Sequence, residues 1–244
     1  MADKDTSRDI RTLFAQFRTS DHWAVSLARD LIWVAGVVGG IALSLFLICG
    51  TWPAVVTIES GSMIPNMNIG DLVVVVQQDR YGEFLTWEEG KQANVTKFNN
   101  YGDVIIYKPN GLDSVHPIIH RTMVYATNTT PLSEIRGSQL RTNYTAAHDG
   151  YITWGDHNPA PDQFVTYPGI GTPEPVKEEW IVGKALFTVP LVGYLPLHIW
   201  EVIVVVIVIM VLHELYLRSR ESKSDNGSER GKPKKKSGKK KNQG

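Results

Sequence analysis

Residues 54–77 read AVVTIESGSMIPNMNIGDLVVVVQ, and this stretch decides which kind of domain the chain forms. Two runs rich in β-branched residues, 54–58 and 72–77, flank a polar segment that contains glycine and proline. Apolar and β-branched runs between turn signals are typical of β-strands. Gly70 and Asp71 stand directly before the second run and mark a turn. The stretch therefore predicts two strands that are joined by a loop.

Further runs of the same kind follow along the chain. They cover residues 104–107, 118–125, 151–154 and 181–187. Helical periodicity is poor between them, and six short strands without long helices predict an antiparallel barrel-like or folded sheet. We therefore expect a mostly β domain over residues 52–189. Two polar stretches, 79–100 and 127–148, are predicted to be surface insertions in this domain.

An apolar segment precedes the β region. Residues 31–50 read LIWVAGVVGGIALSLFLICG and contain no charged side chain. About twenty apolar residues suffice for a helix that spans a bilayer, which favours a membrane helix over a buried core helix. Thirty polar residues come first and no small-residue cleavage site stands before Trp52, so a cleaved signal peptide fits less well. We interpret residues 31–51 as a retained signal anchor and residues 1–30 as a cytoplasmic segment.

A second apolar segment lies near the end of the chain. Residues 202–212 are wholly apolar, and extension to 199–217 includes three polar residues close to its ends. Pro190 and Pro196 argue against one long helix across the whole region. We interpret residues 190–217 as membrane-associated, with a second transmembrane helix as the favoured reading. A re-entrant or interfacial element is the alternative.

The charge distribution predicts a topology. The net charge is zero, but residues 52–189 carry an excess of six acidic side chains and residues 190–244 an excess of six basic ones. Residues 218–244 are rich in Lys, Gly and Ser and are predicted to be disordered. The positive-inside rule places this tail in the cytoplasm, which leaves residues 52–189 on the extracytoplasmic side of the cell membrane. A tail that is merely solvated and a tail that binds a partner are both open, with anionic lipid as the favoured partner and nucleic acid not expected.

Three sequons agree with an extracytoplasmic domain. They begin at Asn94, Asn128 and Asn143, and each is a possible glycosylation site. A fourth sequon at Asn226 falls in the presumed cytoplasmic tail, so a single match proves little. Cys49 is the only cysteine, and an intramolecular disulfide is therefore impossible.

The loop in the deciding stretch carries a candidate nucleophile. Residues 60–65 read SGSMIP, and Gly61 permits a tight backbone path. A serine in such a turn, Ser60 or Ser62, can present its hydroxyl beside backbone N–H groups, which is what acyl transfer requires. The three letters SGS alone more often mark an ordinary loop, because catalytic motifs need their structural context.

A serine nucleophile needs a base and a group that orients the base. His116 and His120 stand in the segment HPIIHR, and on a strand they would lie about 13 Å apart at about 3.3 Å per residue. One metal ion cannot bridge that distance, so we predict no metal site there, and either histidine is a candidate base at this point. The segment GDHNPAPD supplies Asp156 and Asp162 as orienting carboxylates, although Asp156 also suits a purely structural turn.

These three motifs together resemble the type I signal peptidases, more closely their archaeal and endoplasmic-reticulum branch than the bacterial one. SGSMIPNMNIGD is similar to the nucleophile box of that family, and the match assigns Ser62. DVIIYKP followed by PIIHR is similar to the box of the base, which assigns His120 where the bacterial branch has lysine. GDHNPAPD is similar to the acidic box, which implies Asp162 as the third triad member and Asp156 as support. His157 departs from the asparagine that is usual in this box.

The resemblance implies a membrane-bound serine endopeptidase that removes signal peptides from exported preproteins and uses no cofactor. Its substrates would carry small side chains before the cleavage site and bind as an extended strand, with the translocation channel as a possible partner. Ser60 and Met63 would belong to the oxyanion and substrate-binding region. Two other classes stay open at this point: a non-catalytic, membrane-anchored β domain that binds a ligand, and a metal-dependent hydrolase using His116, His120 and His157.

Overall fold

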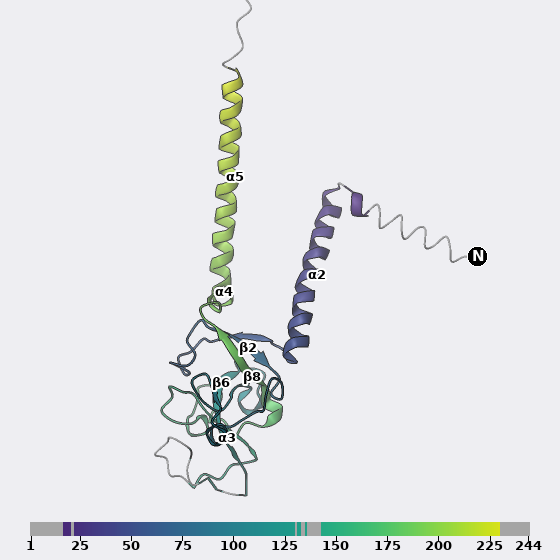
Figure 1. The fold of residues 1–244 in the computed structure, drawn as a ribbon. Helices are drawn as coiled ribbons and strands as arrows, with labels where there is room; N and C mark the ends of the chain where they lie inside the picture. Colours follow the sequence, from purple (N-terminus) through teal and green to yellow (C-terminus); the bar gives the residue numbers. More distant parts are fainter. Residues whose placement is uncertain (1–16, 21, 130, 133–134, 136–142, 230–244) are drawn as a thin grey trace, which may run out of the picture. The chain divides into compact units, whose positions relative to one another are not determined.

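The computed structural model describes residues 17–20, 22–129, 131–132, 135 and 143–229 (Figure 1). The chain divides into two compact units, residues 1–193 and 194–244. In the described residues, the first unit contains helix α2 (Trp23–Cys49), which is followed by a β domain. Its strands are β1 (Val55–Thr57), β2 (Leu72–Val76), β3 (Thr96–Lys97), β4 (Asn100–Tyr101), β5 (Val104–Tyr107), β6 (Ile118–Ala126), β7 (Gly150–Trp154) and β8 (Ile181–Val189).

Six of these strands form one antiparallel sheet in the order β1-β2-β8-β5-β6-β7. They correspond to the six predicted runs, with ends that differ by at most two residues. The expected mostly β domain with an antiparallel sheet is therefore confirmed. The short strands β3 and β4 form a separate hairpin.

The core covers both faces of the central strand β5, whose four residues are all buried. Val104 and Ile106 pack with residues of the loop after β1, whereas Ile105 and Tyr107 pack with Val176. Because successive side chains of a strand point to opposite faces, a strand that is apolar throughout is buried on both sides. The wholly apolar run VIIY is therefore explained by the inner position of β5 in the sheet.

The first predicted insertion is more ordered than its polar composition indicates. It contains helix α3 (Trp87–Ala93), which begins with a capping box between Thr86 and Glu89. The sequence TWEE carries this signal, because a threonine followed three residues later by glutamate satisfies the free N–H groups of a first turn. This insertion is therefore not only a surface segment, since Trp87 is buried against the core.

The second predicted insertion, residues 127–148, is described only in part. Leu132 pairs with Tyr144, and Ile135 and Ala146 are buried in the core beside β6 and β7. This segment is therefore not only a surface insertion. The sequon residues Asn94, Asn128 and Asn143 are all exposed, which keeps them accessible for the predicted glycosylation.

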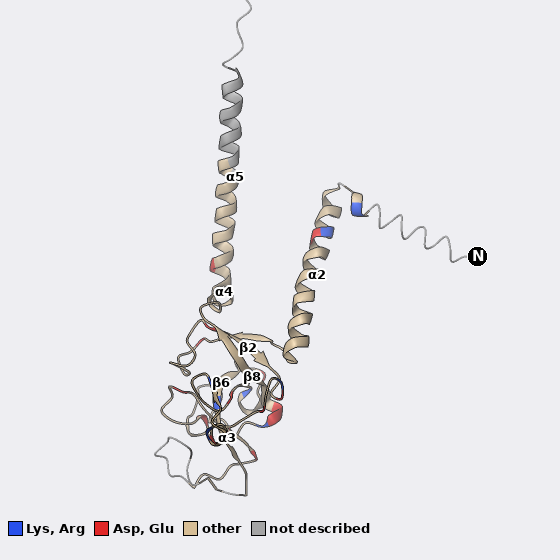
Figure 2. Ribbon diagram, viewed as in Figure 1, with Lys and Arg blue, Asp and Glu red and all other residues tan. Residues whose placement is uncertain are grey.

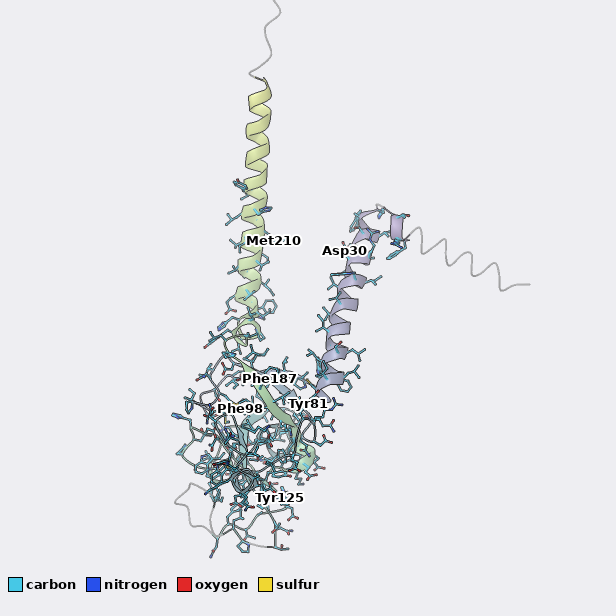
Figure 3. All side chains as sticks on the ribbon, viewed as in Figure 1. Asp30, Tyr81, Phe98, Tyr125, Phe187 and Met210 are labelled. Atoms are coloured by element: carbon cyan, nitrogen blue, oxygen red, sulfur yellow. The ribbon has the colours of Figure 1, made fainter. Side chains whose placement is uncertain are left out.

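Helix α2 is long and apolar enough to cross a membrane, and it is the only such helix in the described ranges. Its Arg29 and Asp30 lie in the N-terminal part and the rest is uncharged (Figures 2 and 3). Its C-terminal end is held by Arg80, whose Nη1 donates to the carbonyls of Leu47 and Ile48 at 2.7 and 2.8 Å. A cation at this end also complements the helix dipole.

The second unit contains α4 (Tyr194–Leu197) and α5 (Ile199–Glu229). The apolar part of α5, Ile199–His213, is shorter than a typical membrane span, so the second transmembrane helix stays a prediction. Helix α5 continues to Glu229, whereas we predicted disorder from residue 218 onwards. The segment 218–229 contains no proline and several strong helix formers, which allows the helix to continue. Residues 230–244 of the predicted tail lie outside the described residues.

Candidate active site

Ser62 lies in the loop that connects β1 to β2. Two buried methionines, Met63 and Met67, hold this loop in the core. The N–H groups of Asn66 and Met67 both donate to the carbonyl of Met63 at 3.0 Å. The buried methionines and this compact turn fix the backbone next to Ser62. The predicted strand–loop–strand arrangement around Ser62 is therefore present.

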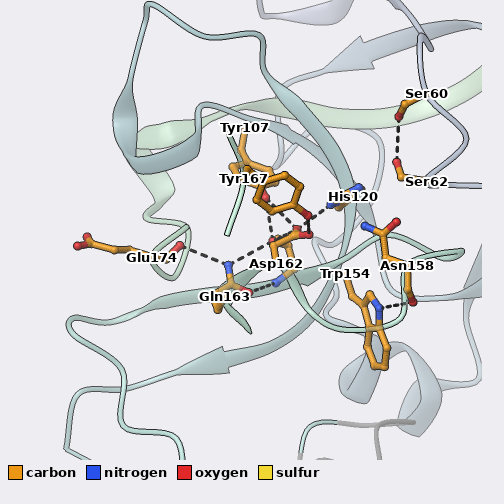
Figure 4. A network of polar contacts seen from close by, with 11 residues as sticks. Ser60, Ser62, Tyr107, His120, Trp154, Asn158, Asp162, Gln163, Tyr167 and Glu174 are labelled. Carbon is orange, nitrogen blue, oxygen red and sulfur yellow. Dashed lines mark hydrogen bonds and ion pairs between the residues drawn. The ribbon is translucent and has the colours of Figure 1, made fainter. Parts of the chain in front are cut away.

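The side chain of Ser62 is accompanied by a second hydroxyl. Ser60 Oγ lies 3.2 Å from Ser62 Oγ, and Figure 4 shows the two hydroxyls directed toward one another. Ser60 is thus placed as the sequence predicts for a donor beside the nucleophile. Met63 is different, because its side chain is 1% exposed and packs in the core. Its predicted contact with substrate is corrected to the anchoring of the loop.

His120 lies on β6, opposite Ile105 of β5, and its ring is buried. Its Nδ1 is 2.7 Å from Oδ2 of Asp162. A carboxylate on Nδ1 fixes the ring orientation and the tautomer, which leaves Nε2 free to accept a proton. Of the two predicted carboxylates, Asp162 is the one that contacts His120.

Asp162 lies in the 3-10 turn Asp162–Phe164 and is fully buried. Besides His120, its Oδ2 accepts hydrogen bonds from Tyr107 Oη at 2.9 Å and from Thr153 Oγ1 at 2.6 Å. Its Oδ1 accepts one from Tyr167 Oη at 2.8 Å, so the carboxylate has four partners (Figure 4).

Two opposing effects set the ionisation of this carboxylate. Burial alone would raise the pKa of Asp162, but the attraction of His120 and the hydrogen bonds from His120, Thr153 and Tyr167 hold that pKa below its ordinary value. Burial and the neighbouring Asp162 charge raise the pKa of Tyr107 and of Tyr167. Asp162 is therefore ionised at neutral pH, while both tyrosines stay protonated and donate to it.

Gly155 lies beside the free nitrogen of the base. A Cβ atom at this position would come within 2.8 Å of three atoms: His120 Nε2, the Ser62 carbonyl oxygen and Asn158 Nδ2. His120 Nε2 and the Ser62 carbonyl oxygen are therefore separated by no more than twice that distance. The N–H of His157 donates to the same carbonyl at 2.8 Å, so the acidic segment is hydrogen-bonded directly to the backbone of Ser62.

Asp156 has a different partner from Asp162. Its two oxygens accept from Nε and Nη2 of Arg121 at 2.8 and 2.6 Å, and Oδ2 also accepts from Asn66 Nδ2 at 2.8 Å. Arg121 is the neighbour of His120 on β6, and Asn66 belongs to the loop of Ser62. Asp156 thus connects strand β6, which carries His120, to the loop of Ser62 and has no hydrogen bond with His120 itself.

The Arg121 guanidinium is fully buried and extends this connection to the β3–β4 hairpin. Its Nη1 donates to the carbonyls of Lys97 and Gly102 at 2.9 and 2.7 Å. A buried cation must be paired and fully hydrogen-bonded, because its desolvation is costly. The pair of Asp156 and Arg121 therefore has a structural role beside the site. This agrees with the prediction that Asp156 also suits a purely structural position.

The residues of the alternative metal site are not brought together. His116 precedes β6 and is exposed, and the side chain of His157 is exposed as well, whereas His120 is buried. Within the part of the chain that the structure describes, no group of three His, Cys, Asp or Glu side chains has the proximity of a metal site.

Several residues of the site escaped the sequence reading. Tyr107 and Arg121 stand inside the segments DVIIYKP and PIIHR, so their place beside the base was visible in the motifs. Thr153 lies on predicted strand β7, but its direction toward Asp162 depends on strand register. Tyr167 has no signal in the sequence, since only the loop after Asp162 brings its hydroxyl to the carboxylate.

Neither a comparison with models of known protein families nor a search of curated proteins finds a match to this chain. The function therefore has to be argued from the site itself.

Proposed function

We propose that this protein is a membrane-bound serine endopeptidase that removes signal peptides from exported preproteins. The observation that carries the proposal is the buried pair of His120 and Asp162, whose nitrogen and oxygen are 2.7 Å apart, beside the loop of Ser62. A carboxylate with four hydrogen-bonding partners holds the ring in one orientation. A domain that only binds a ligand has no need of such an arrangement.

The proposed chemistry gives each of these groups a role. Ser62 Oγ attacks the scissile carbonyl carbon while His120 Nε2 takes its proton, and Asp162 stabilises the resulting imidazolium. The Ser62 N–H and the Ser60 hydroxyl donate to the developing oxyanion, and one such donor is worth about 3 kcal/mol in the transition state. The C–N bond then breaks as Nε2 returns the proton to the leaving amine. Water hydrolyses the acyl-enzyme by the same route in reverse.

The choice of substrate rests on the surroundings of the site. Helix α2 can anchor the chain in a membrane, and residue 50 at its end precedes Ser62 by only a short segment. Strand β1 is an edge of the sheet and leads into the nucleophile loop, so an extended substrate can add beside it. An exported preprotein with small side chains before the cut meets both requirements. The translocation channel and membrane lipid are the proposed partners.

The proposed position of the domain relative to the membrane follows from helix α2 as the anchor. The catalytic domain would lie on the extracytoplasmic side of the cell membrane, with both chain ends in the cytoplasm if α5 also spans. The exposed sequon residues are compatible with this side.

A cleavage assay with the purified full chain in detergent tests the proposal. We expect the protein to cut a preprotein behind its signal segment, at a site preceded by small residues one and three positions away. EDTA should leave the rate unchanged, because serine chemistry needs no metal. A preprotein in which the residue before the cut is replaced by phenylalanine is the matched control and should resist cleavage. Loss of activity in EDTA would favour the metal-dependent hydrolase instead.

A further inference from the structure

The side-chain amide of Asn158 lies beside the base. Its Nδ2 and His120 Nε2 are each 2.8 Å from the point that a Cβ atom of residue 155 would occupy. The two nitrogens are therefore within twice that distance of each other, and Figure 4 shows the amide nitrogen directed toward the ring. Among the residues that the structure describes, this amide has no hydrogen-bonding partner.

The backbone of Asn158 is held on both sides. Its N–H donates to the Gly155 carbonyl at 2.9 Å, and its carbonyl accepts from Trp154 Nε1 at 2.9 Å. Pro159 follows and further restricts the backbone of the residue before it. A fixed backbone limits the positions that the amide can reach. The side-chain amide of Asn158 therefore lies near His120 Nε2 and makes none of the hydrogen bonds of the turn.

The space beside Nε2 has a defined use in the proposed reaction. His120 returns its proton through this nitrogen to the leaving amine, so the residue after the scissile bond must lie here. The groups proposed as oxyanion donors, the Ser60 hydroxyl and the Ser62 N–H, belong to a different loop and would bind the acyl part of the substrate. A primary amide beside the leaving group is a suitable donor for a main-chain carbonyl.

We propose that Asn158 Nδ2 donates a hydrogen bond to the main-chain carbonyl of the residue that follows the scissile bond. Asn158 is then a specificity-determining binding residue on the leaving-group side, and the inference rests on the proposed peptidase function. It favours substrates that continue as a peptide beyond the cut over those that end there. Gly155 leaves room for this hydrogen bond, since a side chain at that position would fill the space next to Asn158 Nδ2.

Two substrates with the same acyl part separate this role from a general one. The first is a peptide that continues for several residues after the cut, and the second is an ester that ends at the cut. We expect Asn158→Ala to lower the ratio of kcat/KM for the peptide to that for the ester by about three- to tenfold, as the loss of one hydrogen bond implies. Asn158→Leu is similar in size to asparagine and should lower the ratio equally, because it cannot donate.

The outcomes are distinct. If Asn158→Leu leaves the peptide-to-ester ratio of kcat/KM unchanged, the inference is overturned. This holds if neither rate falls, and also if both rates fall equally because His120 is disturbed. Thermal unfolding of each variant identifies a folding defect, and Asn158→Leu decides the question if Asn158→Ala does not fold. If wild type cleaves neither substrate, or if Ser62→Ala cleaves both, the proposed function fails instead.

Discussion

Asp162→Asn should lower kcat for preprotein cleavage by about ten-thousandfold while the protein stays folded. In a serine triad this replacement favours the wrong tautomer of the histidine and costs about that factor. The reason is specific here, because Asp162 Oδ2 is 2.7 Å from His120 Nδ1 and an amide nitrogen in that place would donate where the carboxylate accepts. Single-turnover kinetics with the purified chain in detergent would measure the loss.

Asp156→Asn is the matched control, since it makes the same chemical change six residues earlier in the same segment, at a side chain that does not contact His120. It leaves the fully buried Arg121 without its carboxylate, and breaking a buried ion pair costs about 3 kcal/mol or more. We expect a lower melting temperature and a smaller loss of kcat in the protein that remains folded. If Asp156→Asn has the larger effect on kcat and Asp162→Asn has little, the assignment of the two carboxylates is wrong.

Gly155→Ala should lower kcat by at least about a hundredfold. The new Cβ would lie 2.8 Å from His120 Nε2 and from the Ser62 carbonyl oxygen, a separation that real Cβ atoms do not tolerate. The ring or the nucleophile loop must therefore move, and a displacement of about 1 Å in an active site costs about that factor. The substitution adds a methyl group where no polar contact is removed, so the effect reports geometry alone.

Gly150→Ala provides the control for crowding. Its Cβ would also meet backbone atoms, Val176 O at 2.8 Å and Pro175 C at 2.9 Å, but Gly150 begins β7 and contacts neither Ser62 nor His120. We expect this variant to lose stability and to keep its kcat per folded molecule. Equal losses of kcat in both variants would show that Gly155 affects folding and not the position of the base.

The strands could be predicted because each is a short β-branched run between turn signals, as in VIIY of β5 and LVVVV of β2. The pattern does not contain their order in the sheet, where β8 inserts between β2 and β5. Helix α3 was missed because its seven residues are mostly polar, although its capping box was present in the sequence. The extent of α5 was missed because composition alone does not decide between a charged helix and a disordered tail.

The candidate site shows the same division. The sequence motifs were enough to propose Ser62, His120 and the two aspartates. Only the structure shows that Asp162, and not Asp156, contacts His120. Asp162 reaches His120 only because the turn after β7 returns to the sheet beside Tyr107. Met63 was misjudged, because its closeness in sequence to Ser62 does not reveal that its side chain turns into the core.

The most direct measurement is cleavage of a preprotein by wild type and by Ser62→Ala, with the new N-terminus identified by mass spectrometry. Among the described residues, the Ser62 hydroxyl has a hydrogen-bonding contact only with Ser60, so we expect its removal to leave the fold unchanged. We predict that wild type releases the mature protein and that Ser62→Ala releases none above the rate without enzyme. Release of the same fragment by Ser62→Ala at a comparable rate would contradict the account.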